Sequence, residues 1–157
     1  MFGTRRCLDR QAFPLDVARL LTWYRVHAYR EATVDTVVTP LGPNRVAVRF
    51  LIREGEPVRV RDFFVEGLDS VPDNQALLAS LPLSRGEPFD TTAMYASRDT
   101  IVRRLRNSGY PDAEAFVGYD THTLDRRADL SFRVATGPRA RIGEVTLRVT
   151  TRPGAPR

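Results

Sequence analysis

Apolar residues recur at helical spacing in two stretches of the chain. The first stripe comprises Val17, Leu20, Leu21, Tyr24 and Ala28. The second comprises Met94, Ile101, Val102 and Leu105. Residues three and four positions apart share one side of a helix, so each stripe predicts an amphipathic helix that packs this side against a core.

The second predicted helix has recognisable residues at both ends. Asp90 precedes it as a possible N-cap. After it, Gly109 can take the left-handed conformation that closes a helix, and Pro111 prevents the helix from continuing. Tyr110 is expected to fold back onto the last turn as a core residue. The first helix has Ala28 where the glycine would be, so we expect its cap to be weaker or differently shaped.

Two alternating runs follow each helix and predict a β-hairpin. In the first hairpin, the side expected to be buried carries Val46, Val48, Phe50 and Ile52. In the second hairpin, the inward positions are Ala128, Leu130, Phe132 and Val134. Asp129, Ser131 and Arg133 then point to water, because successive residues of a strand face opposite sides of the sheet.

One more strand is predicted after each hairpin. The strand after the first hairpin is marked by Val60, Phe63, Val65 and Gly67. The strand after the second is marked by Ile142, Val145, Leu147 and Val149. Residues 74–81 predict a short helix that begins after Asp73 and ends at Pro82.

These elements form a repeat. Tyr29 aligns with Tyr110 at an offset of 81 residues, and one extra residue in the following turn aligns Phe50 with Phe132. The order in one complete unit, from about Val58 to Gly137, is strand, helix, helix, strand, strand. The predicted fold class is therefore α+β, with a three-stranded sheet and two helices on one face.

The composition excludes few classes of function. The chain has 157 residues and a formal net charge of +5, and all 24 of its basic residues are arginine. The arginines are interleaved with acidic residues, and the one tight cluster is Arg103, Arg104 and Arg106. A nucleic-acid-binding module remains an alternative, but this distribution leads us to expect no nucleic acid partner.

The sequence contains no pattern of catalytic or metal-binding residues. Cys7 is the only cysteine, and His27 and His122 lack ligand spacing. Neither a Ser/His/Asp order nor a phosphate-binding glycine loop is present, so we predict no catalytic, cofactor or metal site and no enzyme activity. The first residues lack the apolar core of a signal peptide, which leaves either a cytoplasmic protein or a sequence whose start lies upstream.

The complete unit resembles polypeptide-transport-associated (POTRA) domains, most closely those of BamA/TamA-type outer-membrane assembly factors. The structural motif that carries the resemblance consists of Gly67, Gly86, Asp90, Gly109, Tyr110, Pro111 and Gly137. On this basis residues 58–139 are one complete unit. Residues 1–57 match the C-terminal half of a preceding unit, and residues 140–157 match the first strand of a following unit plus a tail. The chain thus resembles a slice of a tandem array.

The resemblance implies a non-catalytic module without cofactors at the periplasmic face of the outer membrane. In the intact protein, such units precede a C-terminal membrane barrel. Their partners are unfolded outer-membrane polypeptides and, in some cases, accessory lipoproteins. Similar units also occur in two-partner secretion transporters and other polypeptide-transport barrels, and this alternative stays open.

The implied mechanism is β-strand addition, in which an extended polypeptide pairs with an exposed sheet edge. The resemblance assigns this edge to the strand after the long helix, namely Asp112, Ala113, Glu114, Ala115, Phe116, Val117, Gly118 and Tyr119. Gly118 marks either a bulge or a close backbone approach. The alternative is an ordinary sheet edge that a neighbouring unit covers.

Overall fold

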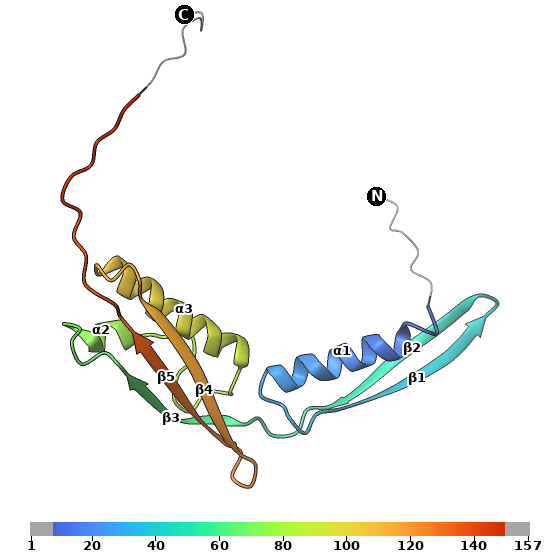
Figure 1. The fold of residues 1–157 in the computed structure, drawn as a ribbon. Coiled ribbons are helices and arrows are strands. Elements are labelled where there is room, and N and C mark those ends of the chain that lie inside the picture. The colour runs from blue at the N-terminus through green and yellow to red at the C-terminus, as the bar shows by residue number, and fades with distance from the viewer. Residues whose placement is uncertain (1–7, 150–157) are drawn as a thin grey trace, which may run out of the picture.

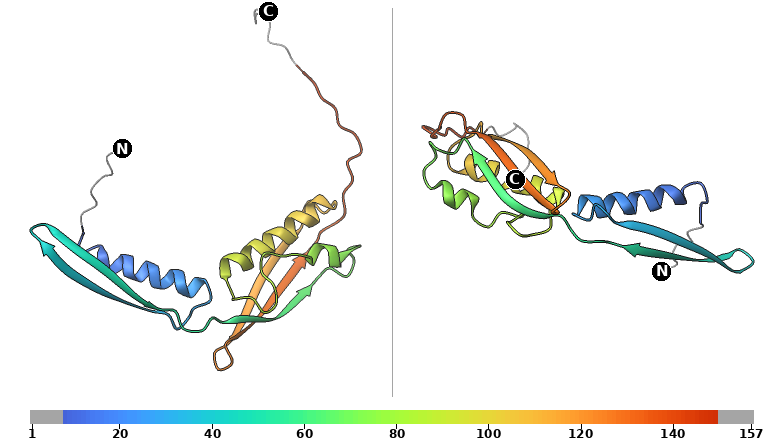
Figure 2. Two further views of the ribbon diagram at one scale, coloured as in Figure 1. Left: turned by 180° about the vertical axis from the view of Figure 1, so that it is seen from behind. Right: turned by 90° about the horizontal axis from the view of Figure 1, so that it is seen from below.

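The computed structural model describes residues 8–149 and contains two groups of elements (Figures 1 and 2). The first group is α1 (Phe13–Val26), β1 (Thr33–Gly42) and β2 (Arg45–Arg53). The second is β3 (Arg59–Glu66), α2 (Asn74–Leu78), α3 (Thr91–Asn107), β4 (Glu114–His122) and β5 (Arg127–Ala135). None of the helices in residues 8–149 has the length and apolar character needed to cross a bilayer.

The second group is a three-stranded mixed sheet covered by two helices, which confirms the predicted fold class. The strand order is β3-β5-β4; β5 pairs with β3 in parallel and with β4 antiparallel. Since β5 lies in the centre, both β3 and β4 are edge strands. Parallel pairing of β3 with β5 requires a crossover, and α2 and α3 lie within this crossover connection.

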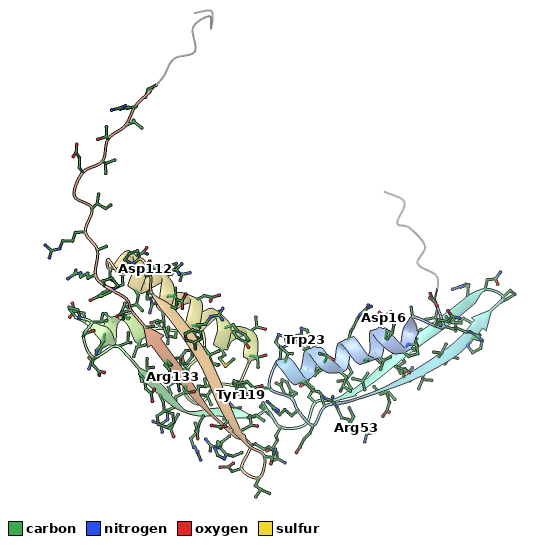
Figure 3. The ribbon with its side chains drawn as sticks, in the orientation of Figure 1. Asp16, Trp23, Arg53, Asp112, Tyr119 and Arg133 are labelled. Atoms are coloured by element: carbon green, nitrogen blue, oxygen red, sulfur yellow. The ribbon has the colours of Figure 1, made fainter. Side chains whose placement is uncertain are left out.

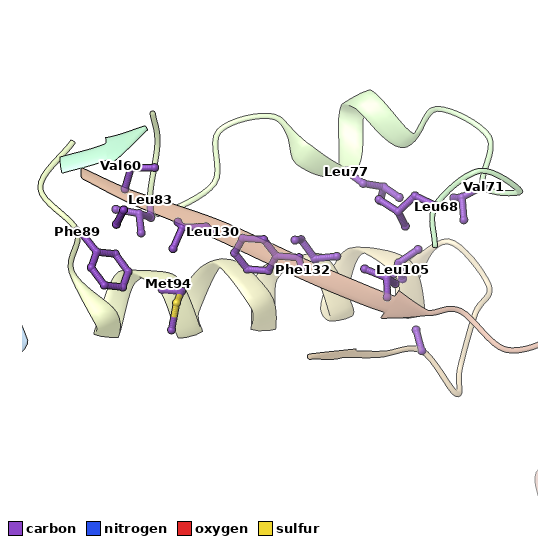
Figure 4. Close-up of a cluster of buried hydrophobic side chains, with 14 of the residues drawn as sticks. Val60, Leu68, Val71, Leu77, Leu83, Phe89, Met94, Leu105, Leu130 and Phe132 are labelled. Carbon is purple, nitrogen blue, oxygen red and sulfur yellow. The ribbon is translucent and has the colours of Figure 1, made fainter. Parts of the chain in front are cut away.

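The hydrophobic core lies between this sheet and the helices (Figure 4). The inward residues of β5 predicted from the alternation are all buried: Ala128, Leu130, Phe132 and Val134. The stripe of α3 supplies Met94, Ile101 and Leu105, which are also buried, whereas Val102 is only half-buried. The periodicity of 2 in the strand and of 3.6 in the helix therefore predicted this core.

Both ends of α3 are as predicted. The Asp90 carboxylate accepts hydrogen bonds from the backbone N–H groups of Thr92 and Ala93 at 2.7 and 3.2 Å. At the C-terminal end Gly109 has a φ of +95°. The backbone N–H of Tyr110 donates to the carbonyl of Leu105 at 3.1 Å, which folds the chain back over the last turn.

The cap of α1 is not differently shaped from that of α3, which leaves a weaker cap as the remaining expectation for Ala28. This alanine adopts a φ of +84°, close to the value at Gly109. The N–H of Tyr29 donates to the carbonyl of Tyr24 at 2.9 Å, which repeats the bond made by Tyr110. The cap therefore has the same shape in both units, and the alanine bears the backbone strain that a glycine would avoid.

The short helix α2 also differs from its prediction. It ends at Leu78 instead of Leu81, and Asp73 makes no side-chain cap bond because it lies in the left-handed region with a φ of +53°. Arg104 explains the early end: its Nη1 donates to the carbonyls of Leu77 and Ala79 at 2.7 and 2.6 Å. These carbonyls face a guanidinium group rather than N–H groups of a further helical turn.

The β1–β2 hairpin forms with a turn at residues 43–44, but its predicted buried face is not buried. Val46, Phe50 and Ile52 are exposed, and Val48 is half-buried. Phe50 touches Phe13 of α1, with ring centroids 5.9 Å apart. This hairpin has no third strand among the described residues, so α1 alone covers its apolar side.

The strand expected at residues 140–149 is not formed in this structure. Residues 138–149 belong to no strand. The apolar side chains Ile142, Val145, Leu147 and Val149 are 79–86% exposed. An isolated strand leaves its backbone groups unpaired, and no strand of the described chain lies beside this segment.

Candidate strand-addition edge

One long side of β4 has no partner strand within residues 8–149. The other side pairs with β5 in an unbroken register from Glu114 to His122. Nine residues of strand correspond to about 30 Å of edge. The unpaired side therefore presents a continuous row of backbone N–H and C=O groups.

The opposite edge of the sheet, along β3, is partly occupied by the chain itself. The N–H of Val60 donates to the carbonyl of Glu87 at 2.9 Å, and the N–H of Gly86 donates to the carbonyl of Val60 at 2.8 Å. The N–H of Phe89 also donates to the carbonyl of Val58 at 2.7 Å. Residues 86–89 thus cover the first half of β3, whereas no segment covers β4 in the same way in the described part of the chain.

The predicted edge residues fall almost entirely on β4. Glu114 to Tyr119 lie in the strand, but Asp112 and Ala113 precede it (Figure 3). The N–H of Ala113 donates to the carbonyl of Tyr110 at 3.2 Å, and its own carbonyl accepts from Arg106 at 3.1 Å. These bonds keep Ala113 in the turn, so the strand begins at Glu114.

Side chains of β4 point alternately to the core and away from it. Ala115 and Val117 pack against the core and are half-buried. Phe116 lies between them, faces the other side of the sheet and is 60% exposed. Gly118 is in regular register with Ser131 and makes no bulge. A β-carbon at Gly118 would lie 2.9 Å from the side-chain oxygen Ser131 Oγ, so a neighbouring side chain, and not a close backbone, occupies the space beside this glycine.

Sequence reasoning missed an apolar patch on the open face of the sheet. Phe64 pairs with Ser131, and Ser131 pairs with Gly118, so the three lie in one row across the strands. Phe116 stands beside this row, and both phenylalanines are exposed. A shallow hollow lies between Phe116, Gly118, Ser131 and Arg133. The signal in the sequence was an aromatic residue at outward positions of two strands.

Ionic side chains gather on the same sheet near the end of β4. Arg61 Nε donates to Asp129 Oδ1 at 2.8 Å, and a second guanidinium nitrogen bonds to Oδ2. His122 Nε2 lies 3.1 Å from Asp129 Oδ2. The hydrogen bond from Arg61 holds the pKa of Asp129 below its ordinary value, and His122 adds to this effect. The cluster links β3, β4 and β5 across the sheet.

The basic cluster on α3 is engaged in bonds within the unit. Arg104 bonds to the end of α2, and Arg106 bonds to the turn before β4. Arg103 Nη2 donates to Thr100 Oγ1 at 3.3 Å. Arg104 and Arg106 thus hold neighbouring elements to α3, whereas Arg103 bonds within the helix.

The first group of elements touches the complete unit beside the end of β4. The N–H of Val58 donates to the carbonyl of Ala28 at 3.0 Å, and Thr91 Oγ1 donates to the carbonyl of Val26 at 3.2 Å. Tyr119 closes the side of this junction, and a hollow between Arg25, Arg30, Thr91 and Tyr119 opens there (Figure 3). The β4 edge therefore runs up to the helix α1 of the preceding group.

Comparison with known proteins identifies the complete unit. The sequence model of the POTRA family, described as a surface antigen variable number repeat, matches residues 58–137. The chain belongs to the POTRA family. No curated protein matches its sequence. Within this POTRA unit β3 opens the fold, β5 is the central strand, and β4 is the uncovered edge.

Solved structures with a similar backbone include two of BamA and one of CdiB. The POTRA3–5 fragment of BamA from Haemophilus influenzae is 19% identical, with a TM-score of 0.48 over 88% of this chain and 55% of that one. BamA from Haemophilus ducreyi, lacking POTRA domains 1–3, is 18% identical, with a TM-score of 0.49 over 86% and 25%. CdiB from Escherichia coli is 16% identical, with a TM-score of 0.36 over 82% and 23%. The chain thus spans about half of the first and about a quarter of the other two.

Proposed function

We propose that this chain is part of the periplasmic POTRA region of an outer-membrane protein assembly or insertion factor. It binds unfolded outer-membrane polypeptides by adding them as a strand to β4, and it carries out no catalysis. In this proposal residues 58–139 form one unit, residues 1–57 are the second half of the unit before it, and residues 140–157 begin the next. Accessory lipoproteins are a further class of partner, and a membrane barrel follows the array.

The observation that carries the proposal is the open side of β4. Main-chain pairing along an edge depends little on the client's sequence, which suits a receptor of many unfolded polypeptides. The half-buried side chains of Ala115 and Val117 add apolar contact on the core side. Exposed Phe116 offers a second apolar contact on the opposite face.

Proline scanning of β4 tests the proposal. Adjacent residues of an antiparallel edge direct their N–H groups alternately to the partner strand and to the open side. One of Phe116→Pro and Val117→Pro therefore removes an outward N–H while the β4–β5 ladder stays intact. We expect the folded variant to bind a fluorescent peptide of alternating apolar and polar residues about tenfold more weakly, from one lost main-chain bond plus the clash of the proline ring.

Val117→Ala is the matched control, because it shortens the same side chain and retains the N–H. Its affinity for the peptide should stay within about threefold of wild type, which corresponds to less than 1 kcal/mol. Unchanged affinity in a folded proline variant would count against β4 as the site. Peptides from membrane barrels and from secreted proteins, compared in the same assay, separate an assembly factor from a secretion transporter.

A salt titration distinguishes the proposed peptide binding from the alternative of nucleic-acid binding. Binding that neutralises phosphates weakens steeply as salt rises from about 50 to 200 mM, since counterions are released on association. Backbone pairing with a peptide of low charge has no such slope. We expect the affinity for the uncharged peptide to change little over this range.

A further inference from the structure

A hollow with two arginines adjoins the β4 edge at the junction with the preceding group of elements (Figure 3). Its lining residues are Thr22, Arg25 and Val26 of α1, Arg30 of the turn after α1, and Thr91 and Tyr119 of the complete unit. Because Tyr119 belongs to β4, a polypeptide that adds to this strand passes the hollow.

The two arginines of the hollow, Arg25 and Arg30, are available to an anion. Both side chains are exposed, and neither guanidinium group forms an ion pair within residues 8–149. The carboxylates next to the lining residues have other partners: Glu31 lies 3.7 Å from Arg126, and Asp90 accepts two backbone hydrogen bonds from α3. A guanidinium group matches the geometry of a carboxylate and forms charge-assisted hydrogen bonds with it. The hollow therefore favours a carboxylate as its ligand.

The direction of Tyr119 determines which side chains of an added strand reach the hollow. The Tyr119 ring packs against buried Phe89, with ring centroids 4.9 Å apart, so it lies on the helix side of the sheet. Residues beside each other on paired strands point to the same side. The residue of an added strand beside Tyr119 therefore points to the side where the two arginines lie. Its neighbours in the added strand point to the opposite side, as Asp120 does in β4.

The side of α1 that carries Arg25 stays accessible when a unit of this fold is complete. At an offset of 81 residues, Arg25 corresponds to Arg106 of α3. Arg106 is exposed and bonds to the turn before β4. The helix α2 packs on another side of α3, where Arg104 bonds to its end. A short helix at the corresponding place in the preceding unit would therefore leave Arg25 uncovered.

We infer that this hollow binds an Asp or Glu side chain of the polypeptide that adds to β4, an inference that rests on the proposed strand addition. The carboxylate accepts hydrogen bonds from the guanidinium groups of Arg25 and Arg30 while the backbone beside it pairs with β4. The strand β4 continues beyond Tyr119 to His122, so a chain paired along its whole length presents a side chain at this place and not its terminus. Backbone pairing alone has little sequence preference, and the two arginines add a preference for one acidic residue on the helix side.

A glutamate scan of a bound peptide tests the acidic preference. The host is a fluorescent peptide of alternating apolar and polar residues, amidated at its C-terminus so that it has no terminal carboxylate. Each position in turn is Glu or Gln, and the affinity for the full chain is measured. Glu should bind about fivefold more tightly than Gln at positions on one face of the peptide, the size expected of exposed ion pairs, and about equally at positions on the other face. The preference measured at about 50 mM salt should shrink to about twofold or less at about 500 mM, because salt screens exposed charges.

Substitution of the two arginines locates the carboxylate. The double variant Arg25→Gln, Arg30→Gln should bind the Glu and Gln peptides equally, and its affinity for the Gln peptide should stay within about twofold of wild type. The matched control is Arg45→Gln, Arg49→Gln, which removes the same charge from exposed positions of β2, in the hairpin that extends away from the complete unit (Figure 1). This control should keep the full preference for Glu. Far-UV circular dichroism of both double variants should match wild type, since all four side chains are exposed.

The outcomes separate this inference from the proposed function. Equal binding of Glu and Gln peptides to wild type, or a preference that survives in Arg25→Gln, Arg30→Gln, would overturn the inference. Strand addition would still stand if one of the β4 proline variants weakens binding of the Gln peptide. If neither proline variant weakens it, strand addition fails and the inference fails with it. A Gln peptide with a free C-terminal carboxylate that alone shows the arginine-dependent gain would assign the hollow to a chain end and overturn its assignment to a side chain.

Discussion

Gly67 gives the sharpest test of how β3 is held against the central strand. The residue has a φ of +86°, and a β-carbon built on it lies 2.0 Å from the carbonyl oxygen of Val134. Carbon atoms pack favourably at about 3.5–4.0 Å, so the substitution Gly67→Ala forces the end of β3 away from β5 by more than about 1 Å. This displacement disturbs the pairing of Val65 with Phe132 and of Glu66 with Arg133.

Gly86 provides a control with the same backbone conformation. Its φ is +85°, and no atom lies within 4 Å of an added β-carbon. An alanine in the left-handed region costs about 1–2 kcal/mol, and this cost is common to Gly67→Ala and Gly86→Ala. Overpacking adds about 1–3 kcal/mol at Gly67 alone. We therefore expect the free energy of unfolding to fall by about 1–2 kcal/mol for Gly86→Ala and about 2–5 kcal/mol for Gly67→Ala.

Urea unfolding followed by far-UV circular dichroism measures this difference. Fluorescence is less suitable, because the only tryptophan, Trp23, lies in α1 outside the complete unit. An m-value equal to that of wild type in each variant would show that both retain the wild-type change in exposed surface. Equal losses of stability, or a larger loss at Gly86, would refute the argument that the carbonyl of Val134 excludes a side chain at Gly67.

Two further predictions concern single side chains. Asp90→Ala should lower the free energy of unfolding by about 1 kcal/mol, because two N–H groups of α3 lose their acceptor. Asp90→Asn should retain most of the wild-type stability, because asparagine is also a good N-cap residue. A loss of stability in Asp90→Asn as large as in Asp90→Ala would contradict the capping role. The Arg61 hydrogen bond lowers the pKa of Asp129 in the folded protein. The stabilisation by the Asp129 carboxylate is therefore complete above the unfolded-state pKa of about 3.9, and it disappears as the pH falls through the lower folded-state pKa. Asp129→Asn should therefore be less stable than wild type near neutral pH, and the gap in urea midpoint should narrow below about pH 4; a gap that is constant with pH would contradict this linkage.

The complete unit was predictable because its signals are local. The stripe of α3, the cap at Asp90 and the turn at Gly109 each depend on residues within one or two helical turns. The alternation in β5 identified its buried side chains correctly. Such signals need no knowledge of the partner element, since the period of the pattern already defines the buried side.

The rest depended on residues far apart in the sequence. The bulge at Arg61 turns its side chain toward Asp129, 68 positions later, and no local pattern marks this pair. Arg104 ends α2 by bonding to carbonyls about 25 residues before it. The alternation at residues 46–52 correctly predicted a strand, but the prediction that one face of this strand is buried was wrong. Burial requires covering elements, and the pattern within one strand does not show whether they are present.

The two edges of the sheet differ in a way that bears on function. Proteins usually protect an exposed edge with prolines, bulges, short strands or charges in its middle. On β4 the acidic residues Glu114 and Asp120 stand near the ends, whereas the middle holds Phe116 and Gly118 in an unbroken register. Residues 86–89 cover part of β3, whereas the β4 edge, which is longer, more regular and less charged, has no covering segment among the described residues. A strand edge that charges guard only near its ends is consistent with the proposed binding of extended polypeptides.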